Sequence, residues 1–301
     1  MQNRIIRGIA IAGATASGKS ALAIQLAKKL NGVIINADSA QVYADLRVLS
    51  ARPSVEDEAK APHALYGFVD GATAFSSADW AKTVVDPITR EERLPILVGG
   101  TGLYFRVLFD GIAELPPIPP AIREQWRAFA KSVPAPELHE ELRKRDPVTA
   151  SRLAVNDTQR ITRALEVFET TNQSLSQIQA EQTKPLLNKD GWQLIVLDAT
   201  RNMLAERIEQ RFAKMMDDGA LEEVRRLLAR NLDAAAPVMK AIGVPELAAH
   251  LNGEIPLSEA VEQAIFATRR YAKRQETWFR NQMPSWQRMT PATVESFDFN
   301  P

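Results

Sequence analysis

A short segment near the start of the chain has the residue types and spacing of a phosphate-binding loop. It matches the pattern G-x-x-x-x-G-K-S and consists of Gly13, Ala14, Thr15, Ala16, Ser17, Gly18, Lys19 and Ser20. In such a loop, backbone N–H groups and the start of the following helix surround an anion. The Lys19 ammonium adds a full positive charge, and the Ser20 hydroxyl can bind Mg²⁺. The pattern predicts a site for a phosphate or a diphosphate, without specifying a nucleotide.

Two other polar turns follow short apolar runs. Asp38 comes shortly after the run Val33–Ile35, and Thr101 comes after the run Pro95–Val98 in a glycine-rich turn. Both runs are typical of buried strands. Open α/β sheets bind ligands beyond the carboxyl ends of their strands. We therefore expect Asp38 and Thr101 to lie near the phosphate-binding loop.

The elements that must position these residues alternate between strand and helix over roughly the first hundred residues, which favours a parallel sheet. The proline cluster 116–120 then interrupts regular structure, residues 121–185 have helical patterning, and a strand returns at 192–197. The expected fold class is α/β, a P-loop NTPase-like parallel sheet core with helices on both faces and an inserted all-helical domain. The expected boundaries are 1–115 and 188–301 for the core and 116–187 for the insertion.

Arg211 lies at the edge of an apolar helical stripe that includes Leu204, Ile208 and Phe212. A charge at that place is unfavourable unless it meets an anion, and the alternative is an arginine that reaches out to solvent.

A final helix is expected from Ser258, as its N-cap, to about Trp286. Cations interleaved with aromatic residues gather on one arc of it, which is typical of a nucleic-acid contact but also of a solvated face. These cations are Arg269, Arg270, Lys273, Arg274 and Arg280.

Composition narrows the class of protein. The 301 residues include 37 Lys plus Arg and 37 Asp plus Glu, so any basic surface must be local. The absence of cysteine excludes disulfides, cysteine-based zinc sites and a cysteine nucleophile. No leader sequence and no apolar run of membrane-spanning length is evident, so we expect a cytoplasmic protein without membrane contact.

With these features in place, the sequence resembles the bacterial tRNA dimethylallyltransferases, also called tRNA isopentenyltransferases. The resemblance covers essentially the whole chain, and the Asp38–Tyr43 block with the last motif is its most specific part. The motifs that carry it are 13–20, 36–43, 99–104, 157–166, 207–212, 240–243 and 271–280.

The resemblance implies transfer of a dimethylallyl group from dimethylallyl diphosphate to N6 of the adenine 3′-adjacent to the anticodon, position 37 of tRNA. The loop 13–20 would bind the diphosphate together with Mg²⁺ on Ser20, with further contacts from Thr101 and Arg211. Asp38 would be the general base that accepts the N6 proton.

The resemblance also implies an anticodon stem-loop as the macromolecular partner, bound by a chain expected to be monomeric. The adenine must leave its stack to reach the loop, and Gln41 is able to pair with it through two hydrogen bonds. The expected tRNA-binding residues are Asp38, Ser39, Ala40, Gln41, Thr101, Arg123, Gln159, Arg160, Ile161, Thr162 and Arg163.

Other functions remain open at this point. Asp198 ends an apolar strand as a Walker B carboxylate would, which fits a small-molecule P-loop kinase that binds ATP. Prenylation of free AMP and non-catalytic RNA binding are two more. The chain departs from the family at Ala14, where proline is common, and it lacks the zinc finger of eukaryotic relatives.

Overall fold

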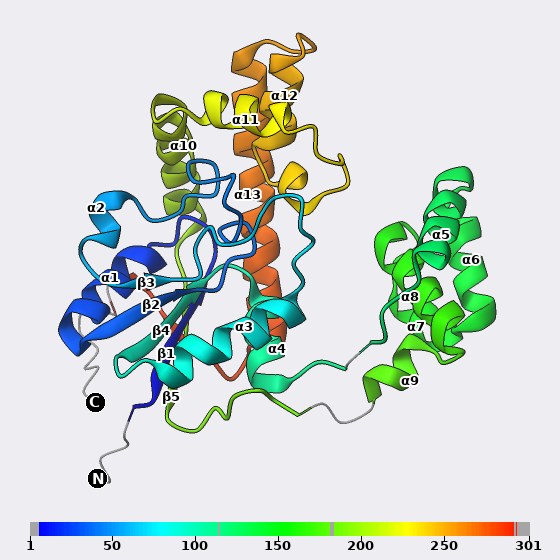
Figure 1. The fold of residues 1–301 in the computed structure, drawn as a ribbon, viewed down its shortest axis with the longest axis horizontal. Helices are drawn as coiled ribbons and strands as arrows, with labels where there is room; N and C mark the ends of the chain where they lie inside the picture. The colour runs from blue at the N-terminus through cyan, green and yellow to red at the C-terminus, as the bar shows by residue number, and fades with distance from the viewer. Residues whose placement is uncertain (1–5, 114, 181–183, 292, 294–301) are drawn as a thin grey trace. The chain divides into compact units, whose positions relative to one another are not determined.

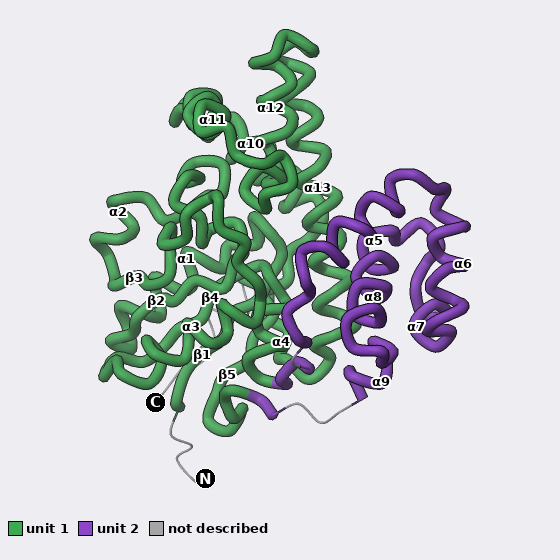
Figure 2. The backbone as a smooth tube through the Cα atoms, turned by 45° about the vertical axis from the view of Figure 1, so that its right-hand side comes forward, with its two compact units in different colours: residues 1–109, 186–301 green, residues 110–185 purple. Residues whose placement is uncertain are grey.

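The computed structural model describes residues 6–113, 115–180, 184–291 and 293. The chain forms two compact units: unit 1 comprises Met1–Phe109 and Leu186–Pro301, and unit 2 comprises Asp110–Pro185 (Figure 2). Unit 2 is therefore inserted within the sequence of unit 1. The sequence places this insertion at 116–187, so the proline cluster expected to open it lies just inside unit 2.

Unit 1 is built on a parallel β-sheet. Its strands are β1 (Gly8–Gly13), β2 (Gly32–Asn36), β3 (His63–Ala64), β4 (Leu94–Gly99), β5 (Trp192–Leu197) and β6 (Gln287–Met289). Across the described residues these six strands lie in the order β3-β2-β4-β1-β5-β6, and neighbours pair in parallel. The carboxyl ends of β2, β4 and β1 are thus adjacent at one edge of the sheet, with β4 in the middle.

Helices connect the strands of unit 1, and several of them lie between β5 and β6. In unit 1 they are α1 (Lys19–Leu30), α2 (Val55–Glu58), α3 (Ser77–Arg90), α4 (Gly102–Asp110), α10 (Arg201–Asp217), α11 (Ala220–Ala229), the 3₁₀ turn η1 (Pro237–Lys240), α12 (Val244–Leu251) and α13 (Leu257–Gln282). Local signals explain several ends. Ser76 and Asp79 form a capping box at the start of α3, and Gly219, with φ 96°, separates α10 from α11.

Helices cover both faces of the sheet, as the sequence predicts (Figure 1). On one face, Leu22 and Leu26 of α1 pack in the same cluster as Ile9 and Ile11 of β1. The alternate β1 residues point to the opposite face, into a larger core that includes side chains of α3, α4 and α13. This two-sided burial explains why the strands are almost continuously apolar.

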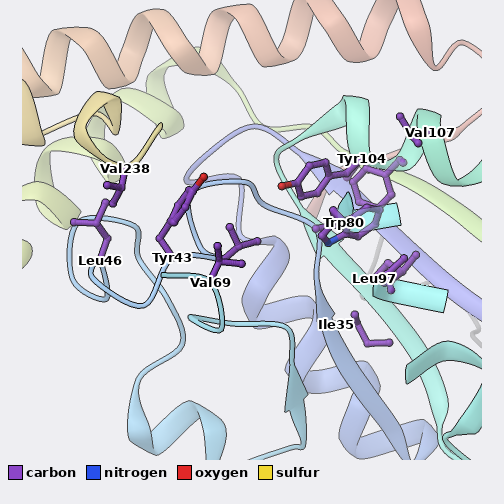
Figure 3. Close-up of a cluster of buried hydrophobic side chains, with 14 of the residues drawn as sticks. Ile35, Tyr43, Leu46, Val69, Trp80, Leu97, Tyr104, Val107 and Val238 are labelled. Atoms are coloured by element: carbon purple, nitrogen blue, oxygen red, sulfur yellow. The ribbon is translucent and has the colours of Figure 1, made fainter. Parts of the chain in front are cut away.

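One aromatic pair in the larger core reaches the functional edge of the sheet. Trp80 of α3 and Tyr104 of α4 are stacked, with ring centroids 4.4 Å apart and an interplanar angle of 12° (Figure 3). The Trp80 indole N–H donates to the carbonyl of Asn36, the last residue of β2, at 2.8 Å. The core therefore holds the end of β2 shortly before Asp38.

Unit 2 is helical throughout its described residues. Its helices are α5 (Pro120–Ser132), α6 (Ala135–Arg145), α7 (Pro147–Arg152), α8 (Thr158–Thr171) and α9 (Leu175–Ala180). It has a core of its own, in which Trp126, Leu142 and Ile161 are buried. The buried Asp146 carboxylate accepts hydrogen bonds from the amides of Thr149 and Leu175, at 2.9 and 3.0 Å, and so ties α7 to α9.

The last long helix differs from its expected bounds at both ends. Pro256, rather than Ser258, is the N-cap of α13, and no side chain caps it. The helix ends at Gln282 instead of near Trp286, because Pro284 disfavours helical backbone at Met283 and lacks an N–H donor.

Candidate active site

The loop between β1 and α1 has the geometry of a phosphate-binding turn. Ala16 and Gly18 have φ values of 63° and 99°, which curl the backbone before the helix begins at Lys19. The Lys19 ammonium donates to the carbonyl of Ala14 at 3.1 Å, and the exposed Ser20 lies in the first helical turn. The loop predicted from the sequence is therefore folded with Lys19 and Ser20 lining the same cavity.

Two cavities meet at this loop. One, of about 460 Å³, is lined by polar groups that include Lys19, Ser20 and Arg207. The other, of about 370 Å³, has a mixed lining: apolar side chains that include Ile208, Phe212 and Met215 of α10, and polar ones that include Tyr271 and Arg274 of α13. Thr15, Asp38 and Arg211 line both, together with Ser50 and Ala51. The carboxylate and the guanidinium thus stand between the polar cavity of the P-loop and a second cavity that also offers apolar side chains.

Lys19 is electrostatically unusual. Burial lowers the pKa of its ammonium to about 8, Asp38 opposes this effect, and Arg211 adds to it. An anion in the polar cavity would favour the charged form of Lys19.

Asp38 is held by a turn that depends on Asn36. The fully buried Asn36 amide donates to the carbonyls of Asp38 and Leu65, both at 3.0 Å, and its oxygen accepts the Asp38 amide at 2.9 Å. The Asp38 carboxylate in turn accepts the amides of Ala40 at 3.0 Å and Gly100 at 3.3 Å. The carboxylate therefore keeps one orientation at the junction of the two cavities.

Thr101 lies beside Asp38, as expected. Its hydroxyl accepts the amide of Ser39 at 2.9 Å and donates to the Ser39 hydroxyl at 3.1 Å. The Tyr271 hydroxyl of α13 also bonds to Thr101, and burial together with nearby Asp38 raises the pKa of Tyr271. The turns after β2 and β4 are thus joined through Ser39 and Thr101.

Two arginines of α10 reach the phosphate-binding loop. Arg211 donates to the Thr15 hydroxyl at 2.7 Å, and Arg207 donates to the carbonyls of Ala16 and Ser17 at 3.4 and 3.3 Å. Burial lowers the pKa of Arg211, but a guanidinium stays charged at neutral pH. Arg211 therefore contacts the phosphate-binding loop instead of extending into solvent, which was the alternative left open by the sequence.

Gln41 does not present its amide for bidentate pairing with adenine. Its Nε2 donates to the carbonyls of Ser50 and Ala51 at 2.9 and 2.8 Å, so both hydrogens are used. Because these carbonyls belong to the segment that lines both cavities, the side chain supports a wall of the site. In this structure the Gln41 amide is therefore not free for the pairing with adenine that the sequence suggests.

The expected tRNA-binding residues of unit 2 separate into exposed and buried groups. Arg123, Gln159 and Arg160 are exposed, whereas Ile161 is fully buried in the helical core and Thr162 is buried with its hydroxyl bonded to Thr158. Direct RNA contact by the last two side chains is therefore excluded in this structure. Both belong to the buried side of α8, together with Ala164 and Leu165.

A buried carboxylate orders two arginines of unit 2. Glu166 is 4% exposed and forms ion pairs with Arg163 of α8 at 3.2 Å and Arg127 of α5 at 3.7 Å. The sequence predicts no role for Arg127, because the residues of α5 do not show that Arg127 pairs with the same carboxylate, that of Glu166, as Arg163.

The cations of α13 are all exposed. Arg269 forms an ion pair with Glu209, while Arg270 and Arg274 lie over the rings of Phe266 and Tyr271, at 5.7 and 5.6 Å from the ring centroids. Lys273 and Arg274 also line a shallow cavity with Trp278.

Among the described residues there is no group of three or more His, Cys, Asp or Glu side chains that could hold a metal ion. In the same part of the chain, no helix combines the length and apolar character needed to cross a membrane.

A P-loop at the edge of a parallel sheet, with a fixed carboxylate at the junction of two cavities, is the arrangement expected of an enzyme that acts on a phosphorylated substrate. A family model described as IPP transferase matches residues 41–282, and one described as isopentenyl transferase matches residues 6–66. The chain therefore belongs to the IPP transferase family, and the resemblance indicated by its sequence motifs is confirmed.

Individual relatives agree with this assignment. The tRNA dimethylallyltransferase of Azorhizobium caulinodans is 51% identical over 289 residues, covering 95% of this chain and 93% of the relative. That of Mesorhizobium japonicum is 49% identical over 293 residues, covering 96% and 91%.

Solved structures support the fold. The tRNA isopentenylpyrophosphate transferase of Bacillus halodurans matches with a TM-score of 0.66 at 33% identity, covering 99% of this chain and 92% of that chain. A eukaryotic dimethylallyltransferase acting on tRNA matches with a TM-score of 0.79 at 27% identity, covering 97% and 76%. The predicted α/β fold class is confirmed.

Proposed function

We propose that this prenyltransferase moves a dimethylallyl group from dimethylallyl diphosphate to N6 of the adenine 3′-adjacent to the anticodon of a tRNA. The observation that carries the proposal is the place of Asp38, which lines both the polar cavity of the P-loop and the second cavity, whose wall includes the apolar side chains of Ile208, Phe212 and Met215. A donor with a charged diphosphate and an apolar chain needs both environments. The family's curated relatives carry the name of this activity.

The residues divide the chemistry among them. The loop amides, Lys19 and Arg211 bind the diphosphate and neutralise the charge that grows on it as the allylic C–O bond breaks. The adenine N6 attacks the allylic carbon, Asp38 accepts the N6 proton, and pyrophosphate leaves. Thr101 keeps the turn that carries Asp38 in place through its bonds to Ser39.

Mg²⁺ is the proposed metal ion. The exposed Ser20 hydroxyl lines the polar cavity, and without an acidic cluster among the described residues the diphosphate oxygens would supply most other ligands. When bound, the ion would add positive charge against the leaving diphosphate.

The pH dependence of donor binding follows from Lys19. We expect the affinity of the free protein for dimethylallyl diphosphate to fall as the pH rises above about 8. Below that pH Lys19 carries its charge. Above it the amine must first take up a proton, which lowers affinity by up to about tenfold per pH unit. Calorimetric titrations on either side of pH 8 measure this, with Lys19→Ala as the control that should lack the step. A parent affinity that is constant across the range would contradict the role of Lys19.

A basic surface on α5 and α8 is the proposed contact for the tRNA stem. Arg127 and Arg163 share the single charge of Glu166, so the cluster keeps net positive charge. Arg160 is exposed, and its surface pair with Asp157 at 3.0 Å is weak enough to exchange for a phosphate. Arg123 and Gln159 extend the exposed polar surface.

Salt dependence tests this surface. Arg127→Gln and Arg163→Gln, made singly so that Glu166 keeps one partner, should each reduce the slope of log K for tRNA against log[salt] by roughly 0.7–0.9. Arg143→Gln is the matched control, because Arg143 is an exposed arginine of unit 2 that pairs with Glu140 on α6. Unchanged slopes in both folded variants would remove these arginines from the interface.

Transfer of a labelled prenyl group tests the function as a whole. The protein is incubated with labelled dimethylallyl diphosphate and either tRNA or free AMP, and label in the RNA is the expected result. Label in AMP alone would assign the enzyme to a free nucleotide. Turnover of ATP to ADP without prenyl transfer would support a kinase. The kinase has little structural support, because Asp198 pairs with Arg288 at 2.7 Å and does not line the P-loop cavity.

A further inference from the structure

We infer that Gln275 of α13 is a positioning residue for the transfer reaction: it holds the diphosphate-binding loop and the catalytic carboxylate at a fixed separation. The inference rests on the proposed function. Its basis is that one buried side-chain amide bonds to two of the three turns that form the site.

The strand order makes such a link necessary. Because β4 lies between β2 and β1, the turn that follows β4 lies between the turn that carries Asp38 and the phosphate-binding loop. Gly100, in that middle turn, donates its amide to the Asp38 carboxylate at 3.3 Å. No equally direct bond to the loop is available from the Gly100 peptide, whose carbonyl points to α13.

Gln275 completes the connection. Its Nε2 donates to the Gly100 carbonyl at 2.8 Å, and its Oε1 accepts the Thr15 amide, also at 2.8 Å. A chain of hydrogen bonds thus runs from the Asp38 carboxylate through the Gly100 peptide and the Gln275 amide to the loop that binds the diphosphate. Thr15 is also the residue whose hydroxyl receives Arg211.

The surroundings of Gln275 leave it little freedom. It is 5% exposed and lies on the buried stripe of α13 with Ala272 and Phe279. A side chain at Gly100 would collide with the Gln275 amide, so the close approach requires glycine there. A polar residue in such a stripe is unfavourable unless its hydrogen bonds are made, and both of these are.

The consequence is kinetic. The attacking N6 must lie within reach of both Asp38 and the allylic carbon, whose place is set by the diphosphate. Displacement of reacting groups by about 1 Å is enough to lower a rate by about 10²-fold. Loss of the Gln275 bonds should therefore lower kcat more than it raises KM for dimethylallyl diphosphate, because Lys19 and Arg211 still bind the anion.

Gln275→Glu is the informative variant, because it keeps the shape and the acceptor for Thr15 but replaces the donor to Gly100. When the introduced carboxyl is protonated it donates to the Gly100 carbonyl, and when it is ionised its oxygen repels that carbonyl. Burial and the Asp38 carboxylate on the Gly100 amide raise the pKa of such a group, whereas the Tyr271 hydroxyl, which bonds to Gln275, and Arg211, which bonds to Thr15, act in the opposite direction. The ratio of variant kcat to parent kcat should therefore fall as the pH rises.

The experiment compares the parent, Gln275→Glu, Gln275→Asn and the control Gln282→Glu, each checked for folding by circular dichroism. Gln282 is an exposed glutamine at the end of the same helix. We expect kcat to fall about 10- to 100-fold in Gln275→Asn at every pH, and by a similar factor in Gln275→Glu only where the introduced carboxyl is ionised. Gln282→Glu should not change kcat.

Two results would overturn the inference. One is a folded Gln275→Asn or Gln275→Glu variant with kcat within twofold of the parent across the pH range. The other is a loss confined to KM. If Gln275→Glu does not fold, the kcat and KM of Gln275→Asn decide the outcome. Absence of transfer by the parent protein would instead contradict the proposed function, so the two failures are distinguishable.

Discussion

Asp38→Ala is expected to lower the single-turnover rate of dimethylallyl transfer by about 10²–10⁴-fold while leaving the binding of both substrates nearly intact. The reason is that in the proposed mechanism Asp38 acts on a proton of the acceptor and is not a main ligand of the diphosphate. Rapid-quench measurements with enzyme in excess over tRNA separate this chemical step from substrate binding and product release.

Two companion variants sharpen this test. Asp38→Asn keeps an acceptor for the Ala40 amide but cannot take up the proton, so it should be as slow as Asp38→Ala. Asp198→Ala removes the carboxylate that a kinase would need and that here only pairs with Arg288, so it should be near the parent rate. Single-turnover transfer by Asp38→Ala within threefold of the parent would exclude Asp38 as the base.

Lys19→Ala is expected to weaken dimethylallyl diphosphate about 10- to 100-fold and tRNA far less. A hydrogen bond to a charged group contributes about 1.5–3 kcal/mol, and Lys19 directs its charge into the polar cavity. Equilibrium titrations with each substrate alone measure the two effects separately.

The matched control for this variant is Lys28→Ala, an exposed lysine in the last turn of the same helix, which should leave both affinities unchanged. Equal losses of donor and tRNA affinity in Lys19→Ala would mean that the loop is not the isoprenoid site. That outcome would also revive the kinase alternative.

The parts of the site that are contiguous in sequence could be predicted from it. The P-loop pattern includes its own strand and helix, so Lys19 and Ser20 could be placed by local reasoning alone. Asp38 and Thr101 could be placed at the same edge because parallel strands share a carboxyl end. The α/β class followed from the alternation of strand and helix signals.

Orientation and long-range packing could not be predicted in the same way. The motif around Ile161 names neighbouring residues but not which of them face the core, and Ile161 and Thr162 prove to be buried. The Gln41 amide donates to the carbonyls of Ser50 and Ala51, and no local sequence pattern indicates such a contact between loop residues.

For Gln275, the sequence indicates that the side chain needs hydrogen-bond partners but not which residues these are. A glutamine between Ala272 and Phe279 on a helical stripe must find partners, and that much is visible in the sequence. Its partners are not visible, because they depend on β4 lying between β2 and β1, and strand order is set by pairings between residues far apart in the chain.

The position of the insertion has a consequence for synthesis of the chain. β1 pairs on one side with β4, but its other neighbour is β5, and Gly8 is paired with Trp192. All of unit 2 is therefore translated before the central strand has both partners, at about 5–20 residues per second. Until then the nascent protein has an open, apolar strand edge at its centre, which is a template for wrong pairing. Ribosome-bound intermediates that end before β5 should therefore depend on chaperones more than those that extend beyond it.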